Sequence, residues 1–243
     1  MNNFLTTYFK GFWDKLAGDR RLQIINLAES RARGEVLDCG CDDGTSTVRM
    51  MKKLKIKNIH AIEINKAAAK EAVKRGIKVK IADLNIPFPY RNSRFDLIIA
   101  DQVIEHLWNL DNFTSEIKRI LKKGGTAIIS TENLASWHNI MALVLGLQPF
   151  TGPSLSRLKV VGFHPLTPTF EIIAKRYKDA TQTPEHNKVM TLTGLISLFK
   201  VYGFDIKEIA CVGYFPFSGS VGRFLSSIDK RHSFFITIAV WKK

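Results

Sequence analysis

The sequence has few of the features that mark secreted or membrane-spanning proteins. Its 243 residues include only three cysteines, Cys39, Cys41 and Cys211, and no two of them form a Cys-x-x-Cys pair. This spacing predicts neither a disulfide framework nor a metal site, and it is typical of a reduced protein. The opening residues lack the signature of a signal peptide, and no apolar run approaches the roughly 20 residues that cross a bilayer. We therefore expect a cytoplasmic enzyme or binding protein.

Acidic residues are also scarce. The chain has 22 Asp and Glu against 36 Lys and Arg, so its formal net charge is +14. Eleven of the basic residues and only two acids lie between Arg49 and Lys80. Solvated faces of two predicted helices explain this pattern most simply. An acidic partner such as nucleic acid or phosphorylated lipid is a minority interpretation, in which the charge would speed the encounter.

The hydrophobic periodicity predicts strands and helices in alternation through the first half of the chain. The strands are expected at residues 35–39, 58–63, 78–82, 95–100 and 126–131, and the helices at 45–54, 65–74 and 113–121. A turn at Gly124-Gly125 is expected between the last of these helices and the last of these strands. Such alternation predicts a parallel sheet with helices on both faces. Prolines interrupt residues 132–190, which we interpret as an insertion. A helix at 191–202 and strands at 205–212 and 233–240 follow, and the short 213–231 connection predicts an antiparallel final strand.

Acidic side chains follow four successive predicted strands. Asp38, Glu63 and Asp83 lie at the carboxyl ends of the first three, and Asp101 lies just past the fourth. In an open parallel sheet ligands bind at this edge, because loops and helix N-termini converge there. At Glu63 a carboxylate can accept both hydroxyls of a ribose, and at Asp83 it can accept the amino group of an adenine. Asp38 suits an amino group or a bridging water.

Six segments in this order resemble the class I S-adenosylmethionine-dependent methyltransferases, close to the small-molecule group that includes the ubiquinone-pathway enzymes. The segments are Val36–Gly44, Ala61–Ile64, Ile81–Leu84, Phe95–Asp101, Ile104–Leu107 and Ile120–Gly125. The resemblance implies a Rossmann-like, doubly wound sheet of seven strands with the last strand antiparallel. It also implies S-adenosylmethionine as the cofactor.

The resemblance further assigns parts of the cofactor to individual residues. The methionine part would contact Asp38, Gly40, Asp42 and Gly44; the ribose Glu63 and Ile64; the adenine Asp83 and Leu84; and the sulfonium side Asp101 and Gln102. Asp42 stands where the family has a glycine, but Asp tolerates a left-handed backbone better than most residues, so the turn can survive. A dinucleotide fits less well, because its pyrophosphate would meet the carboxylates of Asp42 and Asp43.

The N-terminal segment carries an aromatic stripe at helical spacing. Its apolar members are Phe4, Leu5, Tyr8, Phe9, Phe12, Trp13 and Leu16. Asp19 is expected to cap a second helix. The first helix either caps the cofactor pocket or lies on a membrane surface beside a lipidic substrate. Because Lys and Arg are sparse on its polar face, we favour the cap over peripheral membrane contact.

Histidine is the expected source of proton transfer. A hydroxyl acceptor must lose its proton during methyl transfer, and histidine accepts a proton best near neutral pH. We predict that His106, with Glu105 beside it, is the catalytic group; packing in the first turn of a helix is the alternative. Some ubiquinone-pathway relatives hold a divalent metal here in a Glu-x-x-Glu-His cluster, but this chain has Gln102 at its first position. Two ligands make a poor magnesium site, so we expect no required metal.

The chain is interpreted as one methyltransferase domain. It would comprise a helical cap (1–33), a cofactor-binding half (34–131), a substrate-facing insertion (132–190) and a C-terminal helix with two strands (191–243). The residues predicted to contact substrate are Trp137, His138, His186 and Tyr214. The expected reaction transfers a methyl group to a hydroxyl of a sugar, lipid-linked or quinone-like small molecule. The alternatives are an RNA methyltransferase, and a non-catalytic protein of the same fold that binds a cofactor or a partner.

Overall fold

A seven-stranded sheet forms the centre of the protein, in the order β3-β2-β1-β4-β5-β7-β6. The computed structural model describes residues 3–149, 151–153, 186–217 and 219–243, with side chains in the N-terminal helix from Asp14 onward. The strands are β1 (Val36–Cys39), β2 (Ile59–Glu63), β3 (Lys78–Ile81), β4 (Phe95–Asp101), β5 (Leu121–Glu132), β6 (Phe204–Val212) and β7 (Phe235–Lys242). Much of the predicted insertion lies outside the described residues.

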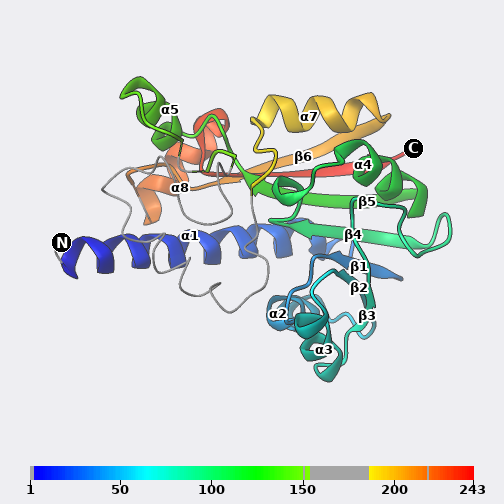
Figure 1. Ribbon diagram of the computed structural model, residues 1–243. Helices are drawn as coiled ribbons and strands as arrows, with labels where there is room; N and C mark the ends of the chain where they lie inside the picture. The colour runs from blue at the N-terminus through cyan, green and yellow to red at the C-terminus, as the bar shows by residue number, and fades with distance from the viewer. Residues whose placement is uncertain (1–2, 150, 154–185, 218) are drawn as a thin grey trace.

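Helices cover both faces of this sheet (Figure 1). The described α-helices are α1 (Asn3–Glu29), α2 (Thr45–Leu54), α3 (Lys66–Lys74), α4 (Leu110–Ile120), α5 (Trp137–Val144), α7 (Leu192–Val201) and α8 (Gly219–Ile228). Two short 3-10 helices, η1 (Ile104–His106) and η2 (Lys230–His232), lie in loops. None of the helices in the described part of the chain has both the length and the apolar character needed to cross a bilayer.

The strand directions confirm the predicted topology. Strands β1, β2, β3, β4 and β5 pair in parallel, whereas β7 pairs antiparallel with both β5 and β6. The 213–231 connection holds a ten-residue helix, α8, but it does not cross over to a parallel strand. A 2.8 Å hydrogen bond from Phe234 N to Gly213 O joins the two ends of this connection, so the chain returns beside β6, the strand that it left.

Two element boundaries differ from the prediction. Helix α1 is one continuous helix of 27 residues, so Asp19 lies inside it and caps nothing. Strand β5 starts at Leu121, directly after α4, where we expected a turn at Gly124-Gly125. The register with β4 shifts at this point, so these glycines form an irregularity within a longer strand rather than a turn.

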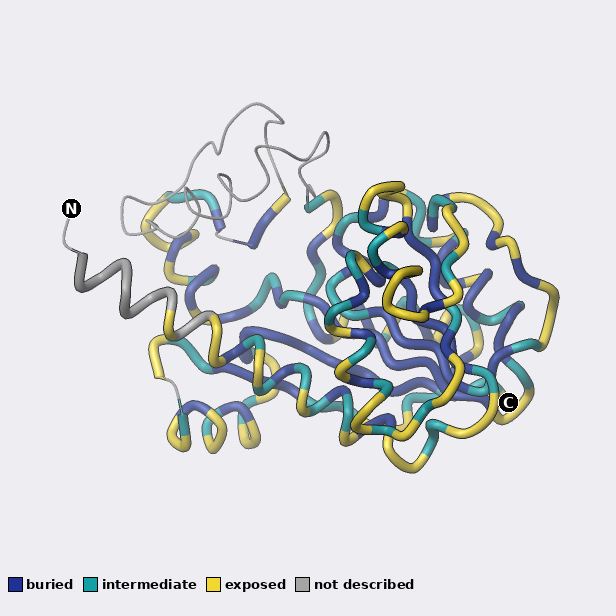
Figure 2. The backbone as a smooth tube through the Cα atoms, turned by 90° about the horizontal axis from the view of Figure 1, so that it is seen from below, coloured by how far each residue is buried: buried dark blue, intermediate teal, exposed yellow. Residues whose placement is uncertain are grey.

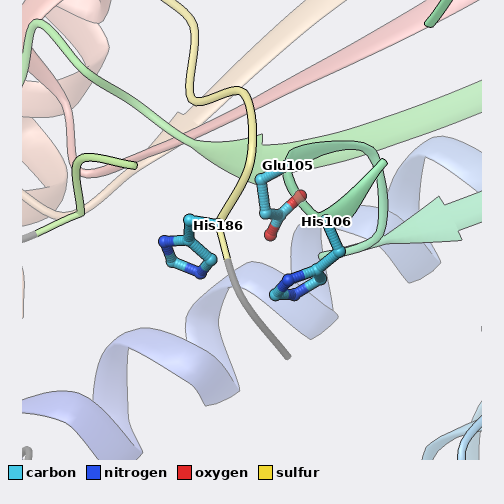
Figure 3. Close-up of side chains that lie close together, drawn as sticks. All are labelled: Glu105, His106 and His186. Atoms are coloured by element: carbon cyan, nitrogen blue, oxygen red, sulfur yellow. The ribbon is translucent and has the colours of Figure 1, made fainter. Parts of the chain in front are cut away.

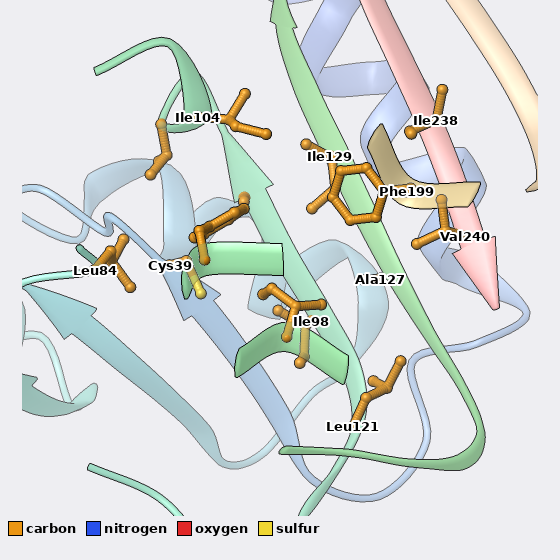
Figure 4. Packing of buried hydrophobic residues seen from close by; sticks show 14 of the residues in the cluster. Cys39, Leu84, Ile98, Ile104, Leu121, Ala127, Ile129, Phe199, Ile238 and Val240 are labelled. Carbon is orange, nitrogen blue, oxygen red and sulfur yellow. The ribbon is translucent and has the colours of Figure 1, made fainter. Parts of the chain in front are cut away.

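Buried apolar side chains form a large cluster on each face of the sheet, and a smaller third cluster contains Leu16, Val212, Phe234 and Phe235. Helices α4 and α7 cover one face, and their Phe113 and Phe199 belong to its cluster. Figure 4 shows Phe199 beside Ile129 and Ile238 of the sheet. Helices α1, α2 and α3 cover the other face. The central strands are buried on both sides, as parallel strands under two helical layers must be, and exposure is concentrated in the outer helices and loops (Figure 2).

Candidate functional site

The predicted acids lie near the carboxyl edge of the sheet, in different surroundings. Glu63 and Asp101 are the last residues of β2 and β4. Asp38 is the last but one residue of β1, and Asp83 lies two residues beyond β3. Because these four strands are parallel and adjacent, the acids share one edge. This arrangement is the one that the sequence predicted.

The turn after β1 has the backbone that a close approach to a ligand requires. Gly40 and Gly44 have φ angles of 76° and 81°, and Asp42 has φ 49°, so this aspartate does adopt the left-handed conformation expected of it. The Glu63 carboxylate accepts hydrogen bonds from Asp42 N at 2.9 Å and from Asn65 N at 2.8 Å. Glu63, the acid predicted to bind the ribose, is therefore hydrogen-bonded directly to the glycine turn.

A carboxylate already occupies the N-terminus of α2. Asp43 accepts hydrogen bonds from Thr45 N at 2.9 Å and from the Thr45 hydroxyl at 2.8 Å. Arg75 also contacts the Asp43 carboxylate, at 3.2 Å. A pyrophosphate would have to displace this like-charged group, which agrees with the sequence argument against a dinucleotide.

Asp38 is buried beneath the turn. Its Oδ2 accepts a 2.6 Å hydrogen bond from the hydroxyl of Thr47 in α2. Burial raises the pKa of Asp38 to about 7, despite the opposing effect of that hydrogen bond. Asp38 can therefore change its charge near neutral pH when a cationic group approaches.

The predicted adenine acid belongs to a loop network. Asp83 accepts two 2.8 Å hydrogen bonds from the backbone and side-chain nitrogens of Asn85. The Asn85 side chain in turn accepts from the amides of Trp108 and Asn109, at 2.9 and 3.1 Å. These hydrogen bonds connect the loop after β3 to the segment that precedes α4. Leu84, which lies in the same loop, is buried. Ile64, the predicted ribose neighbour, is half exposed.

Arg20 of α1 belongs to the site, and our reading of the sequence missed it. Its Nη2 donates to Asp101 Oδ2 at 3.2 Å, and its Nε lies 2.9 Å from Asp101 Oδ1. The guanidinium carbon lies 4.5 Å from the centre of the Phe235 ring, and the residue is only 8% exposed. A signal was available: Arg20 lies midway between the buried Leu16 and Ile24 at four-residue steps, so a cation interrupts the apolar stripe of the helix.

A second group of polar side chains lies at the ends of β4 and β5. Glu105 and His106 of η1 lie close to His186, which is near the C-terminal end of the predicted insertion at 132–190 (Figure 3). The ring centroids of the two histidines are 5.0 Å apart. Thr131 donates a 2.8 Å hydrogen bond to Glu105 Oε2, and burial raises the pKa of Glu105 to about 7.

Glu132, the last residue of β5, lies next to His186 of this group. Its Oε2 lies 3.3 Å from His186 Nδ1. The carboxylate is buried, and burial raises its pKa to about 8, although the positive charge of Arg20 acts in the opposite direction. Burial likewise lowers the pKa of His186. Glu132 was not among the site residues predicted from the sequence.

The other three residues predicted to contact substrate, Trp137, His138 and Tyr214, contact other groups of the protein. Trp137 donates from Nε1 to the Tyr214 hydroxyl at 2.6 Å, and that hydroxyl donates to Asp229 at 2.6 Å. The ring of His138 stacks on Phe234 at a centroid distance of 4.3 Å, and burial lowers the pKa of His138 to about 3. Hydrogen bonds thus join Trp137 to Tyr214, while His138 packs as a neutral aromatic ring. Their predicted substrate contacts remain predictions.

Several buried polar atoms at this edge have no hydrogen-bond partner among the described residues. They include Gln102 Nε2, Glu105 Oε1 and Glu132 Oε2. Gln102 also has φ 58°, a conformation that is uncommon for residues other than glycine. Native proteins rarely leave buried polar groups unpaired, so a ligand, an ion or water is expected at this edge.

Comparison with known proteins agrees with this geometry. A family model described as a methyltransferase domain matches residues 12–209. The chain belongs to this family, and the resemblance inferred from the sequence motifs is confirmed.

Individual relatives and solved structures agree. A probable S-adenosylmethionine-dependent methyltransferase of Mycolicibacterium smegmatis is 29% identical over 216 residues, covering 88% of this chain and 66% of that protein. A ubiquinone biosynthesis O-methyltransferase of Rickettsia conorii is 26% identical over 174 residues, covering 68% of this chain and 60% of that protein. An S-adenosylmethionine-dependent methyltransferase structure from Mesorhizobium loti superposes with a TM-score of 0.58 at 14% identity, covering 93% and 99% of the two chains. This likeness confirms the Rossmann-like fold. The chain spans 42% to 66% of the length of the first curated relatives that it matches.

Proposed function

We propose that this protein transfers a methyl group from S-adenosylmethionine to a small molecule. The observation that carries the proposal is the shared strand edge, where Glu63 is bonded to the glycine turn and acids follow each neighbouring strand. Membership of the methyltransferase-domain family supports it. For the acceptor we propose a hydroxyl of a sugar, lipid-linked or quinone-like compound, which the ubiquinone O-methyltransferase relatives support.

The cofactor would lie along this edge from β3 to β4. Asp83 and Leu84 would hold the adenine, and Glu63 the ribose hydroxyls beside Ile64. The turn at Gly40, Asp42 and Gly44 would pass beneath the methionine part, and Asp38 would face its ammonium group. Asp101 and Gln102 would lie on the sulfonium side.

Arg20 has a natural role in the same arrangement. The methionine end of the cofactor carries a carboxylate as well as an ammonium group, and a guanidinium binds a carboxylate in a two-point geometry. Arg20 lies within hydrogen-bond distance of Asp101, so the pair presents both charges at one place. We therefore include Arg20 among the cofactor-binding residues, which makes α1 part of the site.

The proposed transfer requires alignment of the two reactants and a group that accepts the proton of the acceptor hydroxyl, and for that group we propose His106, with Glu105 beside it. The acceptor attacks the methyl carbon opposite the departing sulfur, and a site that holds both partners in line can supply up to roughly 7–11 kcal/mol of the barrier reduction. Beyond Asp101 the edge continues to Glu105, His106 and His186, which offer polar contacts to an acceptor oxygen.

Calorimetry with S-adenosylhomocysteine tests the cofactor assignment. Glu63→Ala is expected to raise the dissociation constant at least tenfold, which corresponds to about 1.4 kcal/mol. Glu71→Ala is the matched control, because Glu71 of α3 is a half-exposed acid whose ion pairs among the described residues are with Lys74 and Arg75 at the end of the same helix. Equal dissociation constants for Glu63→Ala and the unaltered protein would show that the ribose assignment is wrong.

The acceptor class is tested with methyl-labelled cofactor and fractionated cell extract. Label in a small-molecule, glycan or lipid fraction is the expected result. Label confined to RNA would replace the small-molecule assignment. Absence of label from every fraction, together with intact cofactor binding, would favour a non-catalytic protein.

A further inference from the structure

A cavity of about 380 Å³ lies beside β6, the outermost strand at one edge of the sheet. Its walls are β6, one side of α1 and one side of α8 with the loop that follows it. Among the residues that the structure describes, none of those assigned above to the cofactor or the acceptor lines this cavity. We propose that it binds a small organic anion that has an apolar body and one hydrogen-bond donor. The inference goes beyond the proposed methyl transfer and does not depend on it.

The helices leave this space because of the side chains that they direct toward β6. Asp19, Gln23 and Asn26 of α1 line the cavity, and their steps of four and three residues put them on one side of the helix. A neighbouring side of α1, which carries the buried Ile24, packs into the core. On α8 the buried lining residue is Ser226, whose small side chain leaves room between the helix and the strand.

Gln23 provides an acceptor that lacks a donor. Its Nε2 donates a 2.9 Å hydrogen bond to the carbonyl of Cys211, and this bond fixes the orientation of the amide. Its Oε1 is buried and has no hydrogen-bond partner among the described residues. Native proteins rarely leave buried polar groups unpaired, so a donor is expected at this wall of the cavity. An N–H or O–H group of a ligand would supply it.

Two cations give the cavity a net positive charge. Arg223 of α8 and Lys230 of η2 line it, against the single carboxylate of Asp19. The Arg223 guanidinium lies 3.6 Å from that carboxylate, which is longer than a charge-assisted hydrogen bond. Lys230 Nζ donates to the carbonyl of Ile209 at 3.0 Å, and no carboxylate among the described residues pairs with it. The two cations therefore have donors left for a carboxylate, sulfonate or phosphate group.

The apolar part of the lining comes from the strand and from α1. Ile209 and Val212 of β6 line the cavity together with Leu22 of α1, whose side chain is 53% exposed. A ligand that covers Leu22 removes this apolar surface from water, which favours binding. The volume falls within the range of roughly 300–1,000 Å³ that is typical of small-molecule sites. It accommodates a molecule of the size of a substituted indole.

Calorimetry with three matched indoles tests the inference. The full chain is titrated with indole-3-acetate, which combines a carboxylate, an apolar ring system and one ring N–H. Its methyl ester lacks the charge, and 1-methylindole-3-acetate lacks the ring N–H. We expect saturable binding of one equivalent of indole-3-acetate. The ester should bind at least tenfold more weakly, and the N-methyl compound at least threefold more weakly.

Four variants locate the probe. Arg223→Gln and Lys230→Gln should each weaken binding of indole-3-acetate at least fivefold and leave binding of the ester unchanged. Arg231→Gln is the matched control, because Arg231 is an exposed cation next to Lys230 and does not line the cavity. Gln23→Leu should abolish the difference between indole-3-acetate and its N-methyl derivative, and a persisting difference would contradict the donor assignment. Arg223 and Lys230 are exposed, so their variants remain informative if Gln23→Leu fails to fold.

A competition experiment separates this cavity from the cofactor edge. Saturating S-adenosylhomocysteine should leave the dissociation constant of indole-3-acetate unchanged, whereas displacement of the probe would place it at the cofactor edge and overturn the inference. No saturable binding of indole-3-acetate would overturn it as well, and so would equal binding by the unaltered protein, Arg223→Gln and Lys230→Gln. The affinity for S-adenosylhomocysteine itself reports separately on the proposed function.

Discussion

Replacing Asp38 by Asn should stabilise the ligand-free protein and weaken cofactor binding at the same time. The Asp38 carboxyl is buried, and its pKa is raised from 3.8 to about 7, mainly because burial disfavours the charged form. A raised folded-state pKa means that ionised Asp38 costs stability. The cost is complete above the folded pKa and disappears as the pH falls toward the unfolded value.

The size of the effect follows from that shift. Each pKa unit corresponds to about 1.36 kcal/mol, so the maximal cost is about 4 kcal/mol above pH 7, and about half of it remains at pH 5.5. Asn keeps an oxygen that can accept from Thr47 and carries no charge. Urea unfolding of both proteins at pH 8 and pH 5.5 should show a stabilisation by Asp38→Asn that is about 2 kcal/mol larger at pH 8.

The outcome that would contradict this reasoning is specific. A change in unfolding free energy that is equal at the two pH values would mean that Asp38 ionises normally in the folded protein. The same variant should bind S-adenosylhomocysteine at least tenfold more weakly at pH 8, where the native carboxylate can pair with the ammonium group. Unchanged binding would remove Asp38 from the cofactor site.

Three further predictions concern α1, the turn and the core. Arg20→Met should weaken S-adenosylhomocysteine binding at least tenfold in calorimetry. It should also cost about 1–3 kcal/mol of stability, because it leaves the carboxylate of Asp101, whose side chain is only 22% exposed, without its cation. Adding Asp101→Asn should restore part of the melting temperature, and no restoration would contradict the pairing of Arg20 with Asp101. Gly40→Ala should lower the melting temperature more than Gly76→Ala does. Both glycines have positive φ, but only the methyl group added at Gly40 would lie too close to another side chain, 2.5 Å from a carbon of Val103. Equal losses would show that the turn can move. Phe199→Ala, at a fully buried position, should cost about 3–5 kcal/mol in urea unfolding with cofactor affinity unchanged, and a loss below 1 kcal/mol would mean that the core refills the space.

Local sequence patterns predicted most of the framework. The order of strands and helices, the parallel half of the sheet and the antiparallel last strand all follow from hydrophobic periodicity and connection length. The predictions failed where a local signal competed with packing. Asp19 suggested a helix cap, but buried contacts of Leu16, Ile24 and Leu27 support one continuous helix. The glycine pair at 124–125 suggested a turn, but pairing with β4 extends the strand through it.

The acids at the strand ends were predictable because each of them adjoins a strand. Their partners were not. Arg20 meets Asp101 across 81 residues of sequence, and Asn187 binds the His106 carbonyl across the same separation.

The sequence by itself determined which side chains stand at the carboxyl edge of the sheet and which backbone positions there can adopt a left-handed turn. Only the tertiary structure decided which distant groups face them. Periodicity reports how one segment alternates between solvent and core, a property of neighbouring residues. The approach of Arg20 and His186 depends instead on how α1 packs against the sheet and on how the chain returns from the insertion to η1.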